Sequence, residues 1–249
     1  MDWYRGYDRS FLMPAAADRY PQQIYFAPNR IISGPRSHRV ILMYYLLKDG
    51  CDRGYASMPT VCPASGQTLD QLVQPWLARW PDMQSVFDQA DLPLNLPGET
   101  GHPMQSCWLD QFEAASNSMV YLVTETVAQG RRLHLTEKIF RPICLSMPFL
   151  LVSTQGSLAY LKSYGFQTFG DFWDESYDEE SDDLRRIEKI AKVVRALHDL
   201  SDHARRSLWQ AMQPIVAYNH THFYRGNFEH LLWNELTDML KCLKADFAN

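Results

Sequence analysis

The feature that most constrains the fold of this chain is the alternation of short apolar runs with segments of helical periodicity. Residues 23–28, 118–125 and 148–153 are rich in β-branched and aromatic side chains, which is typical of buried strands. In residues 36–50 and 136–147 the apolar side chains instead recur at helical spacing. Strands that alternate with helices favour an α/β fold built on a parallel sheet, and we predict such a sheet flanked by helices.

Other elements can be placed around this pattern. They are a strand at 54–59 and helices at 69–80, 106–115 and 156–164. For the helix at 36–50, we expect Ser33 or Ser37 to cap the start and Gly50 to mark the end. Residues 91–104 are rich in proline and glycine, so they are predicted to form a loop and are the best candidate for an internal linker.

The length of 249 residues fits one domain better than two, and the sequence has no internal repeat. From residue 179 onward the chain is expected to be mainly helical, with breaks at Pro214 and Gly226. We predict a single α/β domain over residues 1–249. It would comprise an irregular arm (1–21), a core with the binding site (22–165) and a C-terminal part with an aromatic and acidic loop and a helical cover (166–249).

Charge and cysteine content limit the class of protein. A formal charge of -5 disfavours nucleic acid as a partner, because that binding depends on lysine and arginine side chains that neutralise phosphates. The five cysteines are odd in number and form no CxxC pair, which argues against a disulfide framework or a zinc site. We find neither a signal peptide nor an apolar run long enough to span a membrane. These observations predict a cytoplasmic protein without a metal.

The loop at 28–39 is the first candidate binding element. It follows a predicted strand, opens a predicted helix and carries Arg30, Arg36, His38 and Arg39. Cations are unfavourable near a helix N-terminus, so the arginines of the first turn require an anion. That anion is either a ligand phosphate or a carboxylate of the protein, and surface salt bridges are the structural alternative.

The loop at 124–138 is the second candidate. It leaves a predicted strand at Glu125, passes Arg132 and enters a helix through Thr136, Glu137 and Lys138. Thr136 suits a helix N-cap and Glu137 suits the helix dipole, whereas a lysine in the first turn suits neither role. A carboxylate beside an ammonium fits a nucleotide, with the first accepting ribose hydroxyls and the second binding a diphosphate. No glycine-rich phosphate-binding fingerprint is present, which disfavours dehydrogenases and P-loop enzymes.

The segment YLVTETVAQGRRLHLTEKIFRPICLSMPFLLVS, residues 121–153, resembles the donor-binding domain of GT-B glycosyltransferases, most nearly the α-1,3-fucosyltransferase-like group. The shared order is a strand that ends near a glutamate, a Thr-Glu-Lys motif that opens a helix, and a strand led by a proline. The segment is also similar to small uncharacterised proteins of phages and bacteria. The likeness covers about residues 23–165 and is most specific between 118 and 153. It implies a Rossmann-like sheet that corresponds to one half of a GT-B fold.

The resemblance also implies roles for individual residues. Glu137 would hold the donor ribose, and Lys138 with Arg39 or Arg36 would hold the diphosphate of the leaving nucleotide. The donor would be a nucleotide-sugar, with a GDP-sugar favoured and a UDP-sugar as the alternative, and no tightly bound cofactor is expected. The predicted donor site consists of Arg36, Arg39, Arg132, Thr136, Glu137 and Lys138, with Glu125 at its edge as a candidate catalytic residue.

The catalytic base is the open part of this hypothesis, because in the resembled family a separate N-terminal acceptor domain provides it. Residues 165–183 interleave aromatic and acidic side chains, so Asp174, Glu175 or Asp178 is a candidate base for an inverting, metal-independent transfer to a carbohydrate or other hydroxyl acceptor. The alternative is an aromatic-anchored loop that enters the acidic first turn of a helix. A second chain or a homodimer would otherwise supply the acceptor site. A non-catalytic nucleotide-sugar-binding module and a phage-type DNA-base glycosyltransferase are the other functions left open.

Overall fold

The computed structural model describes residues 20–97, 99, 111–226 and 228–247. Its centre is a four-stranded sheet in the order β2-β1-β3-β4, and all three neighbouring strand pairs are parallel. The strands are β1 (Gln23–Ala27), β2 (Gly54–Ala56), β3 (Ser118–Thr124) and β4 (Phe149–Val152). Every residue of β3 and β4 is buried, as expected for strands covered on both faces. The predicted α/β fold with a parallel sheet is therefore confirmed.

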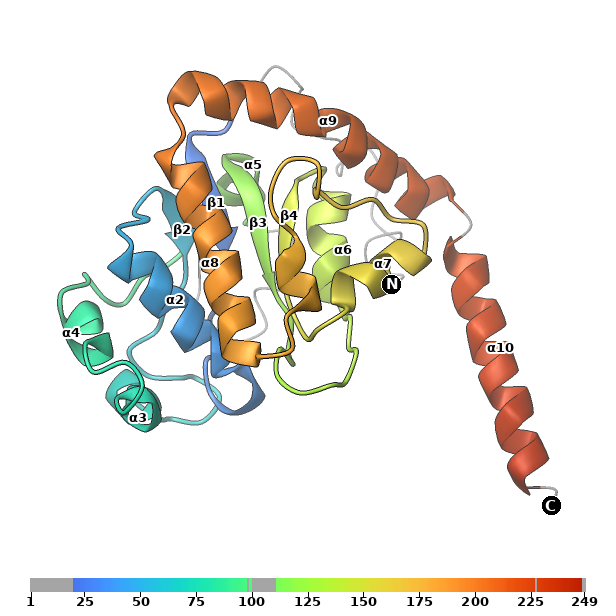
Figure 1. The fold of residues 1–249 in the computed structure, drawn as a ribbon, viewed down its shortest axis with the longest axis horizontal. Coiled ribbons are helices and arrows are strands. Elements are labelled where there is room, and N and C mark those ends of the chain that lie inside the picture. Colours follow the sequence, from blue (N-terminus) through green and yellow to red (C-terminus); the bar gives the residue numbers. More distant parts are fainter. Residues whose placement is uncertain (1–19, 98, 100–110, 227, 248–249) are drawn as a thin grey trace.

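Helices cover both faces of the sheet (Figure 1). Helix α2 (His38–Lys48) lies beside α8 (Asp183–Asp199) on one face, while α6 (Glu137–Cys144) packs against β3 and α9 (Asp202–Arg225) on the other. The shorter helical elements are η1 (Gly34–Arg36), α3 (Leu69–Val73), η2 (Gln74–Trp76), α4 (Met83–Asp88), α5 (Phe112–Ser116), α7 (Ser157–Ser163) and η5 (Ser176–Glu179). The last helix, α10 (Phe228–Phe247), extends away from this body.

Local side-chain chemistry explains several element boundaries. Thr68 and Gln71 form a reciprocal capping box at the start of α3, and Ser201 accepts a hydrogen bond from Ala204 N–H at the start of α9. Gly50 has a φ of +66°, so it ends α2 in the left-handed conformation that was expected of it. Gly54 is required by packing, because a Cβ at this position would lie 2.3 Å from the Tyr25 ring.

Some predictions about where helices begin and end were wrong. The helix predicted at 69–80 ends at Val73 and continues only as the short turn η2, since Pro75 has no N–H to donate. Neither Ser33 nor Ser37 makes a side-chain capping bond at the start of α2. The break predicted at Pro214 is absent, because α9 runs through this residue, while the break at Gly226 is confirmed.

Three predictions fall partly on residues outside the described ranges. Two of them are the irregular arm at 1–21, of which only residues 20 and 21 are described, and the helix predicted at 106–115, of which the structure describes 111–115. The third is the linker predicted at 91–104, which is described at residues 91–97 and 99, and there Leu94 pairs in an isolated bridge with Met58. Within the described ranges, none of the helices has the length and apolar character needed to cross a membrane.

Candidate functional site

The two loops that the sequence singles out leave the sheet at the same edge. In the order β2-β1-β3-β4 the chain moves outward from β1 to β2 and in the opposite direction from β3 to β4. The strand order therefore reverses between β1 and β3, and in open parallel sheets ligands bind beyond the carboxyl ends of the strands at such a reversal. Residues 28–37 follow β1 and residues 125–136 follow β3, so both loops border this point (Figure 1).

Arg39, in the first turn of α2, is buried and joins the two loops. Its Nη1 donates to the carbonyl oxygen of Ile31 at 2.8 Å, and its Nη2 donates to that of Thr124, also at 2.8 Å. Burial, followed by repulsion from Arg36, lowers the pKa of Arg39 to about 10, so the guanidinium stays charged at neutral pH. The first-turn cation thus binds backbone oxygens, and its predicted contact with a diphosphate stays a prediction.

Glu125 is fully buried at the end of β3 and holds the start of α6. Its Oε1 accepts a hydrogen bond from Thr136 N at 3.0 Å, and its Oε2 accepts one from the Thr136 hydroxyl at 2.5 Å. Burial raises the pKa of the Glu125 carboxyl, although the hydrogen bonds from Thr136 and the charge of Lys138 act in the opposite direction. Thr136 in turn caps α6 by accepting from Lys138 N–H at 3.3 Å.

Lys138 completes this chain of contacts toward solvent. Its ammonium donates to Thr136 Oγ1 at 3.1 Å and to Glu137 Oε1 at 2.9 Å. Burial alone would raise the pKa of Glu137, but the hydrogen bond and charge of Lys138 lower it below its usual value. The side chain of Glu137 is 46% exposed and that of Lys138 is 25% exposed. The first-turn lysine is therefore balanced by carboxylates on either side of it, and both side chains remain open to a ligand.

The other cations of the two loops differ in what they contact. Arg30 forms an ion pair with Glu99 at 3.2 Å, so it matches the salt-bridge alternative. Arg36 is partly buried, and Arg132 is exposed. The side chains of both make no hydrogen bond or ion pair within the described part of the chain. The backbone oxygen of Arg132 accepts from Thr154 Oγ1 at 2.9 Å, which fixes its loop beside the end of β4.

His38 lies between these groups and carries no charge at neutral pH. The ring is fully buried, and Nδ1 lies 3.2 Å from the carbonyl oxygen of Pro35. Burial, followed by the charge of Arg39, lowers the pKa of His38 to about 3. The positive charge near the start of α2 therefore comes from Arg36 and Arg39.

Arg186, which sequence reasoning did not single out, supports the site from the first turn of α8. Its guanidinium is buried and donates to the carbonyl oxygens of Ser153 at 2.9 Å, Ala128 at 2.9 Å and Glu180 at 2.6 Å. It also pairs with Asp183, whose other oxygen accepts from Gly130 N at 2.9 Å. These bonds link the loop after β3 to the end of β4. The sequence gives no indication of these bonds, because an arginine beside acidic residues in the first turn of a helix is common.

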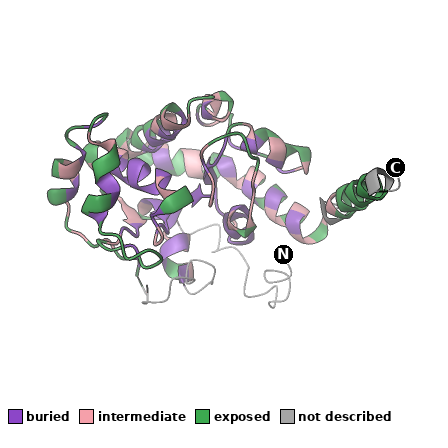
Figure 2. Ribbon diagram, turned by 90° about the horizontal axis from the view of Figure 1, so that it is seen from below, coloured by how far each residue is buried: buried purple, intermediate pink, exposed green. Residues whose placement is uncertain are grey.

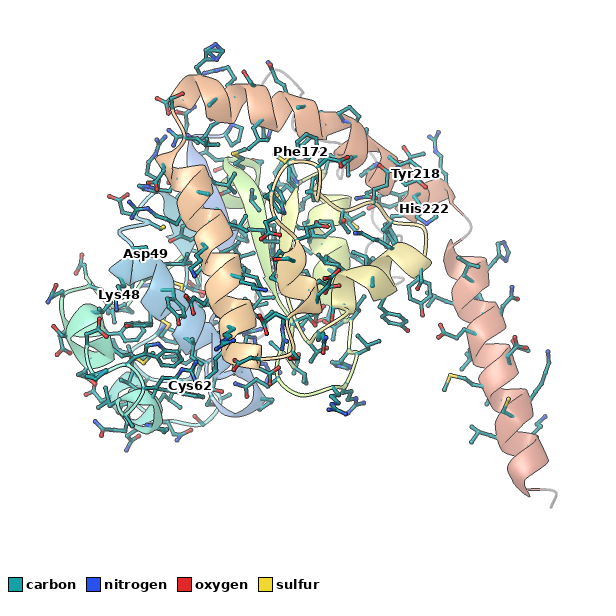
Figure 3. All side chains as sticks on the ribbon, in the orientation of Figure 1. Lys48, Asp49, Cys62, Phe172, Tyr218 and His222 are labelled. Carbon is teal, nitrogen blue, oxygen red and sulfur yellow. The ribbon has the colours of Figure 1, made fainter. Side chains whose placement is uncertain are left out.

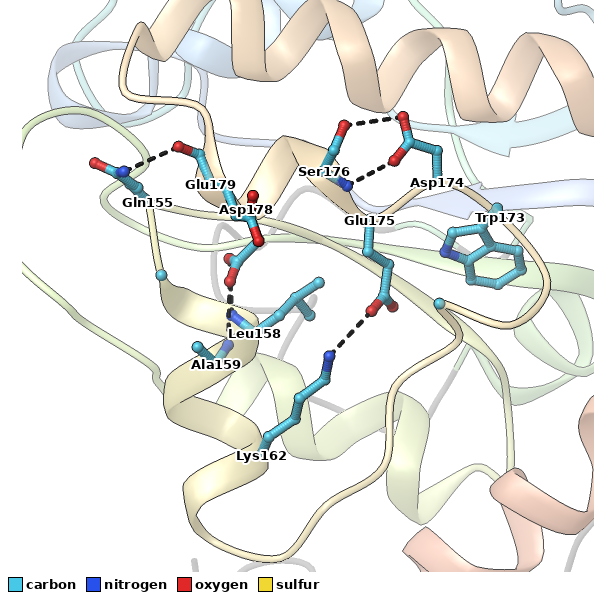
Figure 4. A pocket seen from close by; sticks show the side chains of 12 residues that line it. Gln155, Leu158, Ala159, Lys162, Trp173, Asp174, Glu175, Ser176, Asp178 and Glu179 are labelled. Atoms are coloured by element: carbon cyan, nitrogen blue, oxygen red, sulfur yellow. Dashed lines mark hydrogen bonds and ion pairs between the residues drawn. The ribbon is translucent and has the colours of Figure 1, made fainter.

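The aromatic and acidic segment forms one wall of a pocket of about 590 Å³ beside α7 (Figure 4). The carboxylates of Asp174, Glu175 and Asp178 accept hydrogen bonds within the protein. Glu175 accepts from the Thr168 hydroxyl at 2.6 Å and Phe169 N at 2.8 Å, and it pairs with Lys162 at 3.4 Å. Asp174 accepts two hydrogen bonds from Ser176, which lower the pKa of Asp174.

Asp178, like Asp174 and Glu175, accepts hydrogen bonds within the protein. Its two oxygens accept from Leu158 N at 2.8 Å and Ala159 N at 3.1 Å, which caps the first turn of α7. The aromatic side chains Phe166, Phe169, Trp173 and Tyr177 are buried in the core. These contacts are those of an aromatic-anchored loop, and a role for Asp174 or Glu175 as general base stays a prediction.

The remaining candidates for chemistry lie apart from one another (Figure 3). His222 Nε2 is 2.7 Å from the carbonyl oxygen of Tyr164, and its ring stacks on Tyr218 with the centroids 5.9 Å apart. Cys62 is fully buried, with Sγ 3.2 Å from Ser33 Oγ. Burial would raise the pKa of the Cys62 thiol, but hydrogen bonds led by that with Ser33 lower it to about 6. Among the described residues, no three His, Cys, Asp or Glu side chains are grouped to hold a metal ion.

The structure thus brings together one part of the predicted site. Arg39, Glu125, Thr136, Glu137 and Lys138 are connected by hydrogen bonds through the end of β3. Arg36 and Arg132 lie on the same two loops, and their side chains have no bonded partner in the described ranges. Comparisons with models of protein families, with curated proteins and with solved structures found no match to this chain.

Proposed function

We propose that this chain binds a nucleotide-sugar at the reversal between β1 and β3 and transfers the sugar to a hydroxyl acceptor, as a GT-B-like glycosyltransferase. The observation that carries the proposal is the junction of two loops at that point. Arg39 ties the loop after β1 to Thr124, and Glu125 in the next position holds the Thr-Glu-Lys start of α6. Both loops therefore border one position beyond the strand ends, which is where we expect the ligand.

The side chains at this junction suit the two polar parts of a nucleotide. Lys138 uses two donors on Thr136 and Glu137, and an ammonium has three, so one N–H is left for a phosphate oxygen. Arg36 supplies a guanidinium fork near the start of α2, where Arg39 already repels it and an anion would relieve that repulsion. The Glu137 carboxylate, which is 46% exposed, can accept hydrogen bonds from ribose hydroxyls as well as the one from Lys138.

The same groups would act in the transfer step. The acceptor oxygen loses its proton to a base and forms a bond to the anomeric carbon, while the bond from that carbon to the diphosphate oxygen breaks. The electron pair of the broken bond leaves with the nucleoside diphosphate. Lys138, Arg36 and the N–H groups at the start of α6 would stabilise the negative charge that develops there.

A second function is binding of a nucleotide-sugar without transfer. It is favoured by the hydrogen bonds that the predicted bases Asp174 and Glu175 already accept within the protein. The three contacts of Glu175 and the two of Asp174 leave both carboxylates occupied within the protein. A lowered pKa also makes Asp174 a weaker base. A binding module requires only the donor site and no base.

A thermal-shift panel of GDP-, UDP-, ADP- and CMP-sugars tests donor binding. A ligand present at about 100 times its dissociation constant stabilises the folded chain by about 2.7 kcal/mol. We expect one sugar nucleotide to raise the melting temperature and the variants Glu137→Gln, Lys138→Met and Arg36→Met to weaken this effect. Arg131→Met is the matched control, because Arg131 is exposed on the same loop and is not part of the predicted site.

Release of nucleoside diphosphate, with and without a panel of saccharide acceptors, then separates the two functions. Turnover that is lost in Glu137→Gln supports the transferase, whereas binding without turnover supports the module. Absence of stabilisation by all four sugar nucleotides would contradict both.

A further inference from the structure

Helix α10 carries an apolar stripe that the rest of the described chain leaves uncovered. The helix extends away from the sheet and its flanking helices (Figure 1), and most of its residues are exposed (Figure 2). Among its large apolar side chains the most exposed are Trp233 (62%), Met239 (58%), Leu240 (50%), Leu243 (49%) and Leu236 (45%), followed by Leu231 (44%) on the opposite side. Single exposed apolar side chains are normal, whereas a contiguous group marks an interaction surface.

The five side chains occupy one side of the helix, and we call them the α10 stripe. Their spacings of three and four residues place them within about 120° of the helix circumference. Glu235 lies outside this arc and accepts a hydrogen bond from the Tyr164 hydroxyl, which attaches the first half of α10 to α7. Asn234, Asp238 and Lys241 lie on the opposite side. Leu232, which the same spacing places inside the arc, packs against the core at the start of the helix, so the stripe is uncovered from Trp233 onward.

We propose that the α10 stripe pairs with the α10 stripe of a second copy of this chain, in an antiparallel arrangement with two-fold symmetry. A membrane surface fits less well, because helices that lie on membranes are rich in lysine and arginine. Residues 228–247 instead contain more acidic than basic side chains (Glu229, Glu235, Asp238 and Asp246 against Lys241 and Lys244). A two-fold interface needs a surface that complements itself, and the stripe has this property.

The complementarity follows from helix geometry. With the symmetry axis level with residue 238, Leu236 meets Leu240 of the second copy and Trp233 meets Leu243 of the second copy. Lys244 then lies within one residue of the level of the second copy's Trp233 and on the same flank of the pair. An ammonium over an indole ring is a favourable cation–π contact. The antiparallel direction also opposes the two helix dipoles.

The size of the contact sets the expected strength. A helix of 20 residues is about 30 Å long, so two such helices form a contact near the lower limit of about 1,200 Å² that specific interfaces bury. We therefore expect a dimer whose population changes across protein concentrations of about 1 to 100 µM. The test uses the full chain in sedimentation velocity over this range.

The deciding comparison is between Leu240→Glu, in the stripe, and Asn234→Glu, on the polar side of α10. Each adds one carboxylate to an exposed position of the same helix. Because each dimer contains two copies, Leu240→Glu is expected to weaken association by on the order of 100-fold, which corresponds to a tenfold loss for each copy. Asn234→Glu is expected to leave association unchanged. Circular dichroism and the melting temperature report whether both variants stay folded.

Cysteine cross-linking tests the direction of the pair independently. In a background with the exposed Cys242 changed to serine, Leu236→Cys mixed with Leu240→Cys is expected to form more disulfide-linked dimer than either variant alone. Efficient linking of Leu236→Cys to itself would indicate a parallel pair and would overturn the proposed arrangement. A full chain that stays monomeric at about 100 µM, or equal weakening by both glutamate variants, would overturn the interface itself. Either result is independent of sugar-nucleotide binding.

Discussion

Glu125 Oε2 lies 2.5 Å from Thr136 Oγ1, and this contact joins the buried end of β3 to the start of α6. A second bond, from Thr136 N to Glu125 Oε1, makes the junction bidentate. The geometry accounts for a lysine in the first turn of a helix, where the dipole disfavours a cation. The Lys138 ammonium bonds to Thr136 Oγ1 and pairs with Glu137, so the start of α6 forms a continuous network from core to solvent.

The network predicts that Thr136→Val will be more damaging than loss of a helix cap alone. Loss of the cap costs about 1 kcal/mol, and the buried Glu125 carboxylate left short of a donor adds about 1–3 kcal/mol. Thr136→Ser keeps the hydroxyl and is expected to cost less than about 1 kcal/mol, because only a methyl group is removed. Urea unfolding measures both. Equal costs for the two variants would show that the hydroxyl does not matter.

Arg39 is predicted to stabilise the fold through the two carbonyl oxygens that it binds. Arg39→Met removes both hydrogen bonds and leaves the oxygens of Ile31 and Thr124 without this donor, at a cost of about 2–4 kcal/mol. Arg36→Met is the matched control, and because the Arg36 side chain has no bonded partner in the described ranges, a change within about 0.5 kcal/mol is expected. If Arg39→Met and Arg36→Met lower the midpoint of urea unfolding by the same amount, Arg39 does not hold the two loops together.

The contrast between Arg36 and Arg39 shows how far the sequence could predict this site. The pattern of charges correctly indicated that both lie near a helix start, beyond a strand that ends at the same edge as Glu125. It could not show which arginine is buried, because the oxygen that Arg39 Nη2 binds belongs to a residue 85 positions away. The strand at 118–124 was predictable from its β-branched and aromatic residues, since local composition is enough for a strand buried on both faces.

Pro214 shows the opposite case, in which a strong local signal was overridden. A proline predicts a helix break because it removes one hydrogen bond and crowds the preceding turn. Helix α9 nevertheless continues, with Met212 and Val216 buried on either side of the proline. Packing of this face holds both halves of the helix in line, and periodicity alone does not report the strength of such packing.

His38 predicts a specific dependence of stability on pH. Its pKa of about 3 in the folded chain lies below the value of about 6.5 expected when unfolded, so below pH 6.5 the unfolded chain binds the extra proton. Stability is then lost at about 1.4 kcal/mol per pH unit as the pH falls from about 6.5 toward 3. His38→Gln is expected to remove this slope. Exposed His203→Gln is the control, and it should keep the slope of the parent chain.

The last prediction separates a structural from a catalytic role for the acidic segment. Glu175 accepts from Thr168 and Phe169 N and pairs with Lys162, with only 11% of its side chain exposed. Glu175→Ala should therefore destabilise the chain by about 2–3 kcal/mol, because Phe169 N and Thr168 lose their acceptor. Exposed Asp174→Ala, which frees only Ser176, should cost less than about 1 kcal/mol. If either residue is the base, turnover falls by orders of magnitude while donor binding is kept, and a stable Asp174→Asn chain with full turnover would exclude Asp174.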